Sequence, residues 1–198
     1  VNRVKMPSVG DILGDKLTAY APNTTGIPYI KNGNDASMEI IKQLYDIARL
    51  FEQVDNLETT ARSFDRIAEV ELSYRGMANN LQLIYEDIRQ TSLCLATRGL
   101  EGSGQFDALQ RGIQRIKSFM FGNRYLIDDA IRDASRAAYI ATLLEVGQTE
   151  IEKYDGDFNS IASLEIAPAL TSRLNKLKRT SPEAYYYWAK TSYLLQNR

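Results

Sequence analysis

Apolar residues recur along most of this chain with the spacing of an α-helix. From residue 36 onward they fall three or four positions apart on one helix face, at Ile40, Leu44, Ile47, Phe51 and Val54. Further apolar stripes, each a row of apolar residues along one helix face, continue to about residue 196. No segment shows the alternation of apolar and polar residues that is typical of a half-buried strand. The pattern predicts an all-α fold, an antiparallel helix bundle of four or more helices.

Turn-forming residues divide these stripes. The glycine-rich residues 99–104 form the clearest break in the chain. The stripe that starts near residue 57 continues past Gly76, so this glycine is either a kink or a tolerated interior residue. An alanine-rich stripe predicts one long helix over 124–154 that packs closely on its neighbours. Pro168 suits the first turn of another helix, and Ser-Pro-Glu at 181–183 is a strong start signal for the last one.

The first 34 residues have a different composition. Three of the five prolines lie there, together with Gly10, Gly14, Gly26 and Gly33. We therefore predict an extended N-terminal docking arm over 1–34 and a helical bundle over 35–198. The arm also carries many apolar side chains and should lie against its own bundle or against a partner. Its candidate partner contacts are Val4, Pro7, Ile12, Tyr20, Pro28 and Tyr29.

Composition argues against most catalytic chemistry. The chain has no histidine, which removes the commonest general base and the commonest zinc ligand. The single Cys94 excludes an intrachain disulfide and a thiolate-rich metal site. We therefore expect a protein that is not an enzyme and that needs no cofactor or metal. An enzyme that uses only carboxylates, tyrosine or a bound cofactor is the open alternative.

Charge and hydropathy limit the partners. Lys+Arg 24 against Asp+Glu 25 gives a formal charge of -1, so no overall basic field favours nucleic acid. The longest charge-free apolar stretch in the middle, 137–144, is far shorter than the roughly 20 residues that a bilayer requires. The chain starts at Val1, as expected of a mature form whose targeting segment is gone, or of a shortened chain.

A basic cluster occurs near the C-terminal end of the sequence, at Arg173, Lys176, Lys178 and Arg179. It falls at the expected end of a helix, where cations complement the helix dipole. The cluster is either a solvated helix end or a contact for an acidic partner surface. On the second interpretation, Arg173 and Lys176 are candidate partner-binding residues.

Four consecutive aromatic residues, Tyr185 to Trp188, form the most unusual local feature. Successive residues on a helix are offset by about 100°, so four in a row cannot all face one core. We expect one or two of them to be exposed or to contact something else, with Tyr185, Tyr186 and Trp188 as candidate partner contacts. The alternative is that they pack under the N-terminal arm.

The segment Ser181-Pro182-Glu183-Ala184, with Tyr187, Thr191 and Leu195, resembles the last helix of the PsbQ family. These proteins are extrinsic lumenal subunits of photosystem II. Leu170, Leu174 and Leu177 sit where the family has an apolar helix segment, and residues 80–87 are more loosely similar. The pI of about 5.7 is lower than expected of the plant members, and the first 34 residues carry no matching motif.

This resemblance implies a four-helix bundle behind an irregular arm that docks on a membrane-associated complex. The protein would then be a non-catalytic accessory subunit for photosynthesis, peripheral to the thylakoid membrane on the lumenal side in the chloroplast. Long helices and an apolar arm also fit a helical structural component of a secretion or conjugation apparatus, or of a phage particle. In that alternative the protein belongs to the bacterial periplasm or to a virion.

Overall fold

The structure, a computed structural model, describes residues 6–119, 124–168 and 170–198. Its α-helices are α1 (Val9–Ala19), α2 (Ser37–Gln53), α3 (Glu58–Tyr74), α4 (Leu81–Ala96), α5 (Phe106–Ile116), α6 (Ile127–Glu145), α7 (Leu177–Thr180) and α8 (Pro182–Gln196). Two short strands, β1 (Ile30–Lys31) and β2 (Asn34–Asp35), form an antiparallel hairpin. The prediction of an all-α antiparallel bundle is confirmed, with this hairpin as a minor addition.

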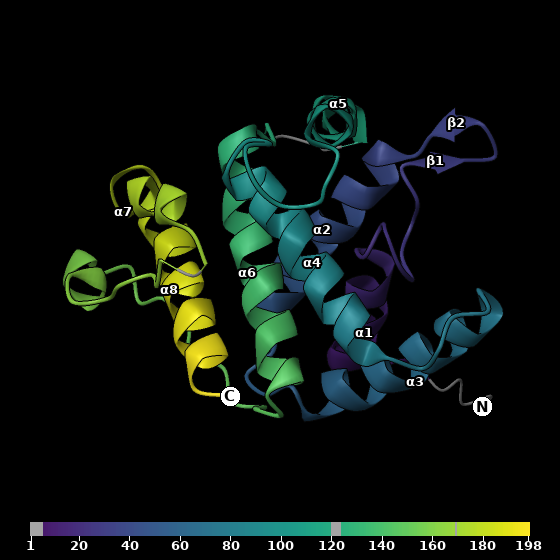
Figure 1. Cartoon of the computed structure of the whole chain (residues 1–198), viewed down its shortest axis with the longest axis horizontal. Coiled ribbons are helices and arrows are strands. Elements are labelled where there is room, and N and C mark those ends of the chain that lie inside the picture. The colour runs from purple at the N-terminus through teal and green to yellow at the C-terminus, as the bar shows by residue number, and fades with distance from the viewer. Residues whose placement is uncertain (1–5, 120–123, 169) are drawn as a thin grey trace, which may run out of the picture.

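Helix α6 lies at the centre of the bundle, between α4 and α8, and it also packs on α2 (Figure 1). From Ala130 to Leu144 every residue except Arg132 is buried. Five alanines in this stretch keep the helix narrow and let its neighbours approach closely. The close packing predicted from the alanines is therefore present.

The predicted helix over 124–154 is too long. Helix α6 ends at Glu145 because Gly147 adopts a left-handed backbone conformation with φ 71°. The amide of Gln148 then donates back to the carbonyl of Leu143 at 2.9 Å, which closes the helix end. The remainder of the predicted helix, residues 146–154, runs as turns and irregular chain.

The prediction of an extended arm is wrong for residues 9–19, which form helix α1. Ser8 and Asp11 make a reciprocal capping box at its start. A Cβ atom on Gly14 would lie 2.8 Å from the backbone nitrogen of Phe64 in α3. Gly10 and Gly14, which in the sequence look like loop residues, are therefore the positions where α1 closely approaches α3.

The chain after α1 is also part of the bundle. The buried carboxylate of Asp87 in α4 accepts from the Asn23 amide at 2.8 Å and from the Thr24 hydroxyl at 2.8 Å. Tyr20 and Tyr29 are buried in the single hydrophobic core. Residues 6–34 thus complete the core of their own bundle, which was one of the two open alternatives for this segment.

The other breaks follow the glycines. Gly76 has φ 64° and ends α3 rather than kinking it, and Asn80 caps the start of α4. Residues 99–104 separate α4 from α5, as predicted. Pro168 does not open a helix, because a 3-10 turn at Ser172–Lys176 and the short α7 follow it only later.

All four aromatic residues of 185–188 are buried, so none is exposed, and the other expected possibility holds: some of them contact a segment other than the helices of the core. One side of α8 packs on α6 and α2, where the Tyr187 ring lies 5.4 Å from those of Tyr139 and Phe51. A covering segment, residues 151–166, lies over its other side. There the Tyr185 hydroxyl donates to the carbonyl of Leu164 at 2.7 Å. The four rings therefore do not all face one core. Some pack on α6 and α2, and others pack on the covering segment.

Replacing Gly14 by Ala should destabilise the fold by about 1–3 kcal/mol, because the added methyl group meets backbone atoms of α3 that cannot move aside. Alanine is the better helix former, so intrinsic propensity alone predicts the opposite sign. Urea denaturation of G14A measures the change. The matched control is D15A at the neighbouring exposed position, expected within about 0.5 kcal/mol of the parent.

Trp188 is the only tryptophan and has 0% of its surface exposed. We expect its fluorescence emission in the isolated protein to be blue-shifted and barely quenched by iodide, because water and ions do not reach the ring. Denaturation in urea should shift the emission to the red and restore quenching. Strong iodide quenching in the native protein would contradict the burial of α8.

Candidate functional site

The structure places the predicted partner-binding residues in three environments. Tyr20, Tyr29, Tyr185, Tyr186 and Trp188 are buried and do not reach the surface. Ile12 is half-buried, whereas Pro7, Pro28, Arg173 and Lys176 are exposed. Val4 lies outside the described residues. The exposed members are therefore the only ones of this set that remain candidates for contact with a partner.

The buried tyrosines have structural roles. The Tyr29 hydroxyl accepts a hydrogen bond from the backbone amide of Gln105 at 3.1 Å, which ties the hairpin region to the start of α5. Burial raises the pKa of Tyr29 to about 12. The hydroxyl of Tyr187 accepts from the amide of Tyr154 at 3.2 Å in the same way. Both side chains hold loops against helices.

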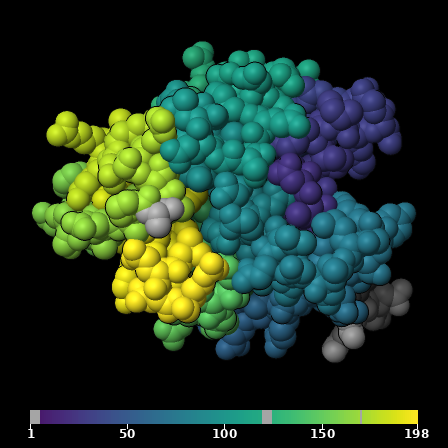
Figure 2. All heavy atoms as spheres, viewed as in Figure 1, coloured from purple at the N-terminus to yellow at the C-terminus, as the bar shows by residue number. Residues whose placement is uncertain are grey.

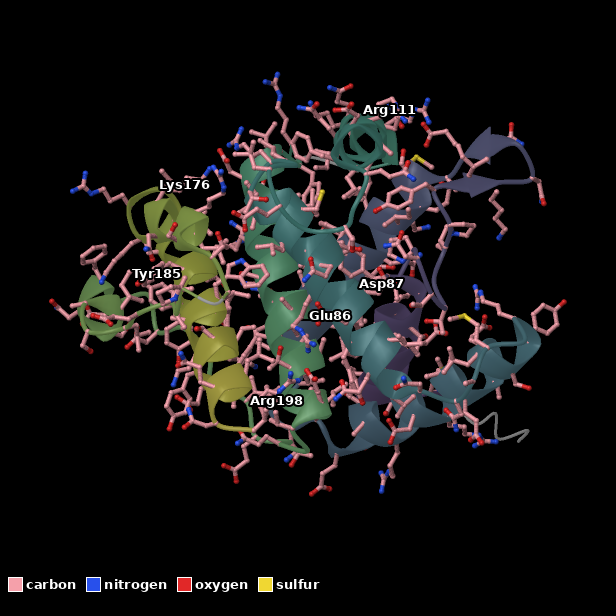
Figure 3. All side chains as sticks on the ribbon, in the orientation of Figure 1. Glu86, Asp87, Arg111, Lys176, Tyr185 and Arg198 are labelled. Carbon is pink, nitrogen blue, oxygen red and sulfur yellow. The ribbon has the colours of Figure 1, made fainter. Side chains whose placement is uncertain are left out.

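Cations gather along one end of the bundle, which we call the basic ridge and which consists of Arg98, Arg111, Arg115, Lys117, Arg173, Lys176 and Arg179. Figure 3 shows Lys176 and Arg111 at this upper end and Arg198 at the opposite end. The α7 end and the α4–α5 loop are joined by the ion pair of Arg173 Nε with Glu101 at 2.8 Å. The ridge therefore runs from α7 across this loop to α5.

A polar groove of about 510 Å³ crosses the ridge. Arg98 and Arg111 both line it, with Phe106 and Ala108 between them. Arg98 adopts a left-handed backbone conformation with φ 54° at the end of α4, a position that favours glycine. Each guanidinium uses one N–H in a side-chain hydrogen bond, Arg98 to Asp128 and Arg111 to Asp35. Donors on both side chains are left to face the groove.

A second hollow separates the hairpin from α3 (Figure 2). This notch has a volume of about 270 Å³, and Lys31 of β1 and Pro28 line one wall. The notch is also lined by Ile67 of α3 and by Arg75, the residue that follows this helix. Arg75 fixes the floor, because its Nη2 donates to the carbonyl of Gly26 at 3.1 Å. The notch is preformed in the isolated chain.

Two large apolar side chains are exposed on α3, the helix whose Ile67 and Glu71 line the notch. Tyr74 is 90% exposed and Val70, one turn earlier on the same face of α3, is 62% exposed. Sequence reasoning missed this pair, although a signal was present. Both residues lie off the apolar stripe that faces the core, and a large apolar residue off the stripe is a candidate for contact with a partner.

The groups with potential reactivity are buried. Burial raises the pKa of the Cys94 thiol to about 11, so the nucleophilic thiolate is scarce at neutral pH. Burial also raises the pKa of the Asp133 carboxyl to about 6. Three guanidiniums surround this carboxylate, those of Arg49 and Arg132 at 3.6 Å and that of Arg136 at 3.9 Å. Asp133 also accepts from the hydroxyl of Tyr125, so it belongs to an interior ion-pair network.

Metal-binding and membrane-spanning features are absent from the parts of the chain that the structure describes. No three side chains of His, Cys, Asp or Glu come together there in a way that would hold a metal ion. None of the described helices is both long and apolar enough to cross a membrane.

Comparison of the chain with protein-family models, with curated proteins and with solved structures gives no match.

The raised pKa of Asp133 predicts a pH-dependent stability. Between the ordinary pKa of 3.8 and about 6, the unfolded chain has lost the proton while the native protein keeps it. The free energy of unfolding should therefore fall as pH rises through this window, by about 2–3 kcal/mol from this group. Urea denaturation between pH 4 and 7 measures the difference between the parent and D133N, in which the amide oxygen still accepts from Tyr125. A difference that does not change with pH would contradict the assignment.

Proposed function

We propose that this chain is a non-catalytic accessory subunit that docks on an acidic surface of a larger protein complex through the basic ridge. The observation that carries this proposal is that seven exposed cations gather on the ridge and three of them are unpaired within the part of the chain that the structure describes. Lys117, Lys176 and Arg179 form no ion pair among the described residues, although Asp and Glu outnumber Lys and Arg in the whole chain. Unpaired cations at one end of a net acidic molecule orient that end toward an acidic partner.

The chemistry of the ridge suits carboxylates. Five of its seven cations are arginines, whose planar guanidinium matches a carboxylate with two N–H groups. Arg98, Arg111 and Arg173 already hold carboxylates of this chain, which fixes their side chains before a partner arrives. A preorganised side chain loses little conformational entropy on binding.

The complex that we propose is photosystem II, with the chain as a PsbQ-like subunit at the lumenal face of the thylakoid membrane. Support comes from the resemblance of residues 181–195, which lie in α8 and its N-cap Ser181, and from the helical bundle that this family also has. Within α8 the residues that carry the resemblance have packing roles, with Tyr187 and Thr191 buried.

The assembly that contains this chain can be isolated from its native source and its absorption spectrum recorded. Chlorophyll absorption that co-purifies with the chain, and that is lost when the chain is washed off with salt, supports the photosynthetic assignment. Co-purification with secretion, conjugation or virion components would contradict it, and would favour the second class of structural subunit.

Reversing two charges on the ridge should weaken docking. The double variant K176E/R179E is expected to bind the assembly about tenfold less tightly at low salt, with a smaller difference at high salt, because surface charges are screened. Rebinding to the salt-washed assembly measures the affinity. The matched control is R62E/R66E, which makes the same change of charge at exposed positions on α3, away from the ridge. Equal weakening by both pairs would contradict a local contact.

A third variant separates docking from stability. In R98G the guanidinium at the groove is lost, but glycine suits the φ of 54° at this position. The free energy of unfolding should rise by up to about 1 kcal/mol, because the strain at this position is relieved. Loss of the exposed ion pair with Asp128 reduces this gain slightly, and docking should weaken. Docking that is unchanged in R98G would remove the groove from the contact.

A further inference from the structure

The hairpin has a free backbone edge at Ile30, next to Lys31, which lines the notch. In the pairing of β1 with β2, the amide of Ala36 donates to the carbonyl of Tyr29, and Ile30 stands opposite Asp35. Hydrogen-bonded and non-hydrogen-bonded pairs alternate in an antiparallel ladder. Ile30 therefore belongs to a non-hydrogen-bonded pair, and its N–H and C=O point away from β2.

The two strands differ in what lies beside them. Asp35 of β2 is anchored on α5 by ion pairs of 3.1 Å with Arg111 and 3.2 Å with Arg115. Lys31 of β1 lines the notch, and no β2 residue does. Figure 1 likewise draws β1 on the side of the hairpin that is turned toward α3. The anchored strand thus holds the hairpin in place while the edge of β1 borders an open hollow.

The turn gives the hairpin a defined shape. Asn32 and Gly33 have φ angles of 51° and 78°, as in the two-residue turn that matches the twist of antiparallel strands. A two-stranded hairpin is marginal by itself, and a third strand would pair the outward groups of Ile30. The Ile30 side chain is 59% exposed, so an incoming strand would also meet an apolar side chain on the edge.

We propose that the edge of β1 accepts an extended segment of a partner protein as a third strand, which then lies in the notch between the hairpin and α3. Main-chain hydrogen bonds to Ile30 supply the pairing, and an apolar side chain of the segment contacts Ile67, which lines the notch. A second copy of this chain is a poor occupant, because antiparallel pairing of two β1 edges brings two Lys31 ammonium groups close together. A small ligand is also disfavoured, since the notch is open and smaller than the roughly 300–1,000 Å³ of typical small-molecule sites.

This inference rests on the proposed function only in that the partner belongs to the complex on which the chain docks. The contact differs from the basic ridge in chemistry, since pairing through the backbone is insensitive to salt at concentrations that screen surface charges. The two contacts can therefore be lost independently of one another.

Proline at position 30 tests the backbone edge. In I30P the outward N–H is removed while the ladder bonds of Tyr29 are kept, whereas in I30A only the side chain is shortened. If a strand adds to β1, I30P should reduce rebinding to the salt-washed assembly at least tenfold more than I30A does. Hydrogen exchange of the peptide that covers residues 27–33 should also slow when the unsubstituted chain is bound. Circular dichroism and melting of the isolated variants check that the bundle is intact.

Each outcome decides one of the two proposals. Equal rebinding of I30P and I30A, or unchanged exchange over 27–33 in the bound chain, overturns the strand addition and leaves docking through the ridge in place. A bound state in which the same region pairs with a second copy, seen as a dimer in solution, overturns the choice of partner. If the unsubstituted chain rebinds to no assembly, the proposed function itself fails, and the strand addition with it.

Discussion

The burial of α6 on all sides is the constraint on which the rest of the structure depends. The alanines of α6 let the neighbouring helices approach closely, while its larger buried side chains, such as Tyr139 and Leu143, fill the space between them. The same burial takes Asp133 and Arg136 into the interior, where a charge without a partner is costly. Arg136 therefore bonds Glu183 of α8 and Glu52 of α2, so that one buried side chain connects three helices.

The helical bundle was predictable because it depends on local periodicity, which each stretch of sequence carries by itself. The stripe of α2 and the start of α8 appear in the structure where the sequence places them. The sequence-based predictions were wrong where contact with a segment distant in the sequence determines the local structure or the burial of a side chain. In the sequence alone, Gly14 indicates a loop. Only its tertiary contact with α3 shows why a side chain is excluded at this position. The aromatic run of α8 likewise has two buried sides because residues 151–166 return over it, which no local pattern indicates.

The candidate site was predictable to a smaller extent. The basic cluster at Arg173 and Lys176 stays at the surface because long charged side chains remain solvated in almost any fold. The groove between Arg98 and Arg111 joins segments that are separate in the sequence, and a single sequence gives no signal for such a meeting. The hairpin was visible only as its Asn-Gly turn, since its two strands are too short to show alternation.

The covering segment has a consequence for the order of folding. It precedes α8 in the chain, yet in the folded protein it lies outside α8 and hydrogen-bonds to it through Tyr154 and Leu164. The contacts of this segment with α8 can form only after α8 has been synthesised, so these contacts close in the reverse of the order of synthesis. Until α8 leaves the ribosome, the apolar face of α6 and the inner face of the segment stay uncovered. The nascent chain is then most prone to aggregation in the interval between the synthesis of α6 and that of Trp188.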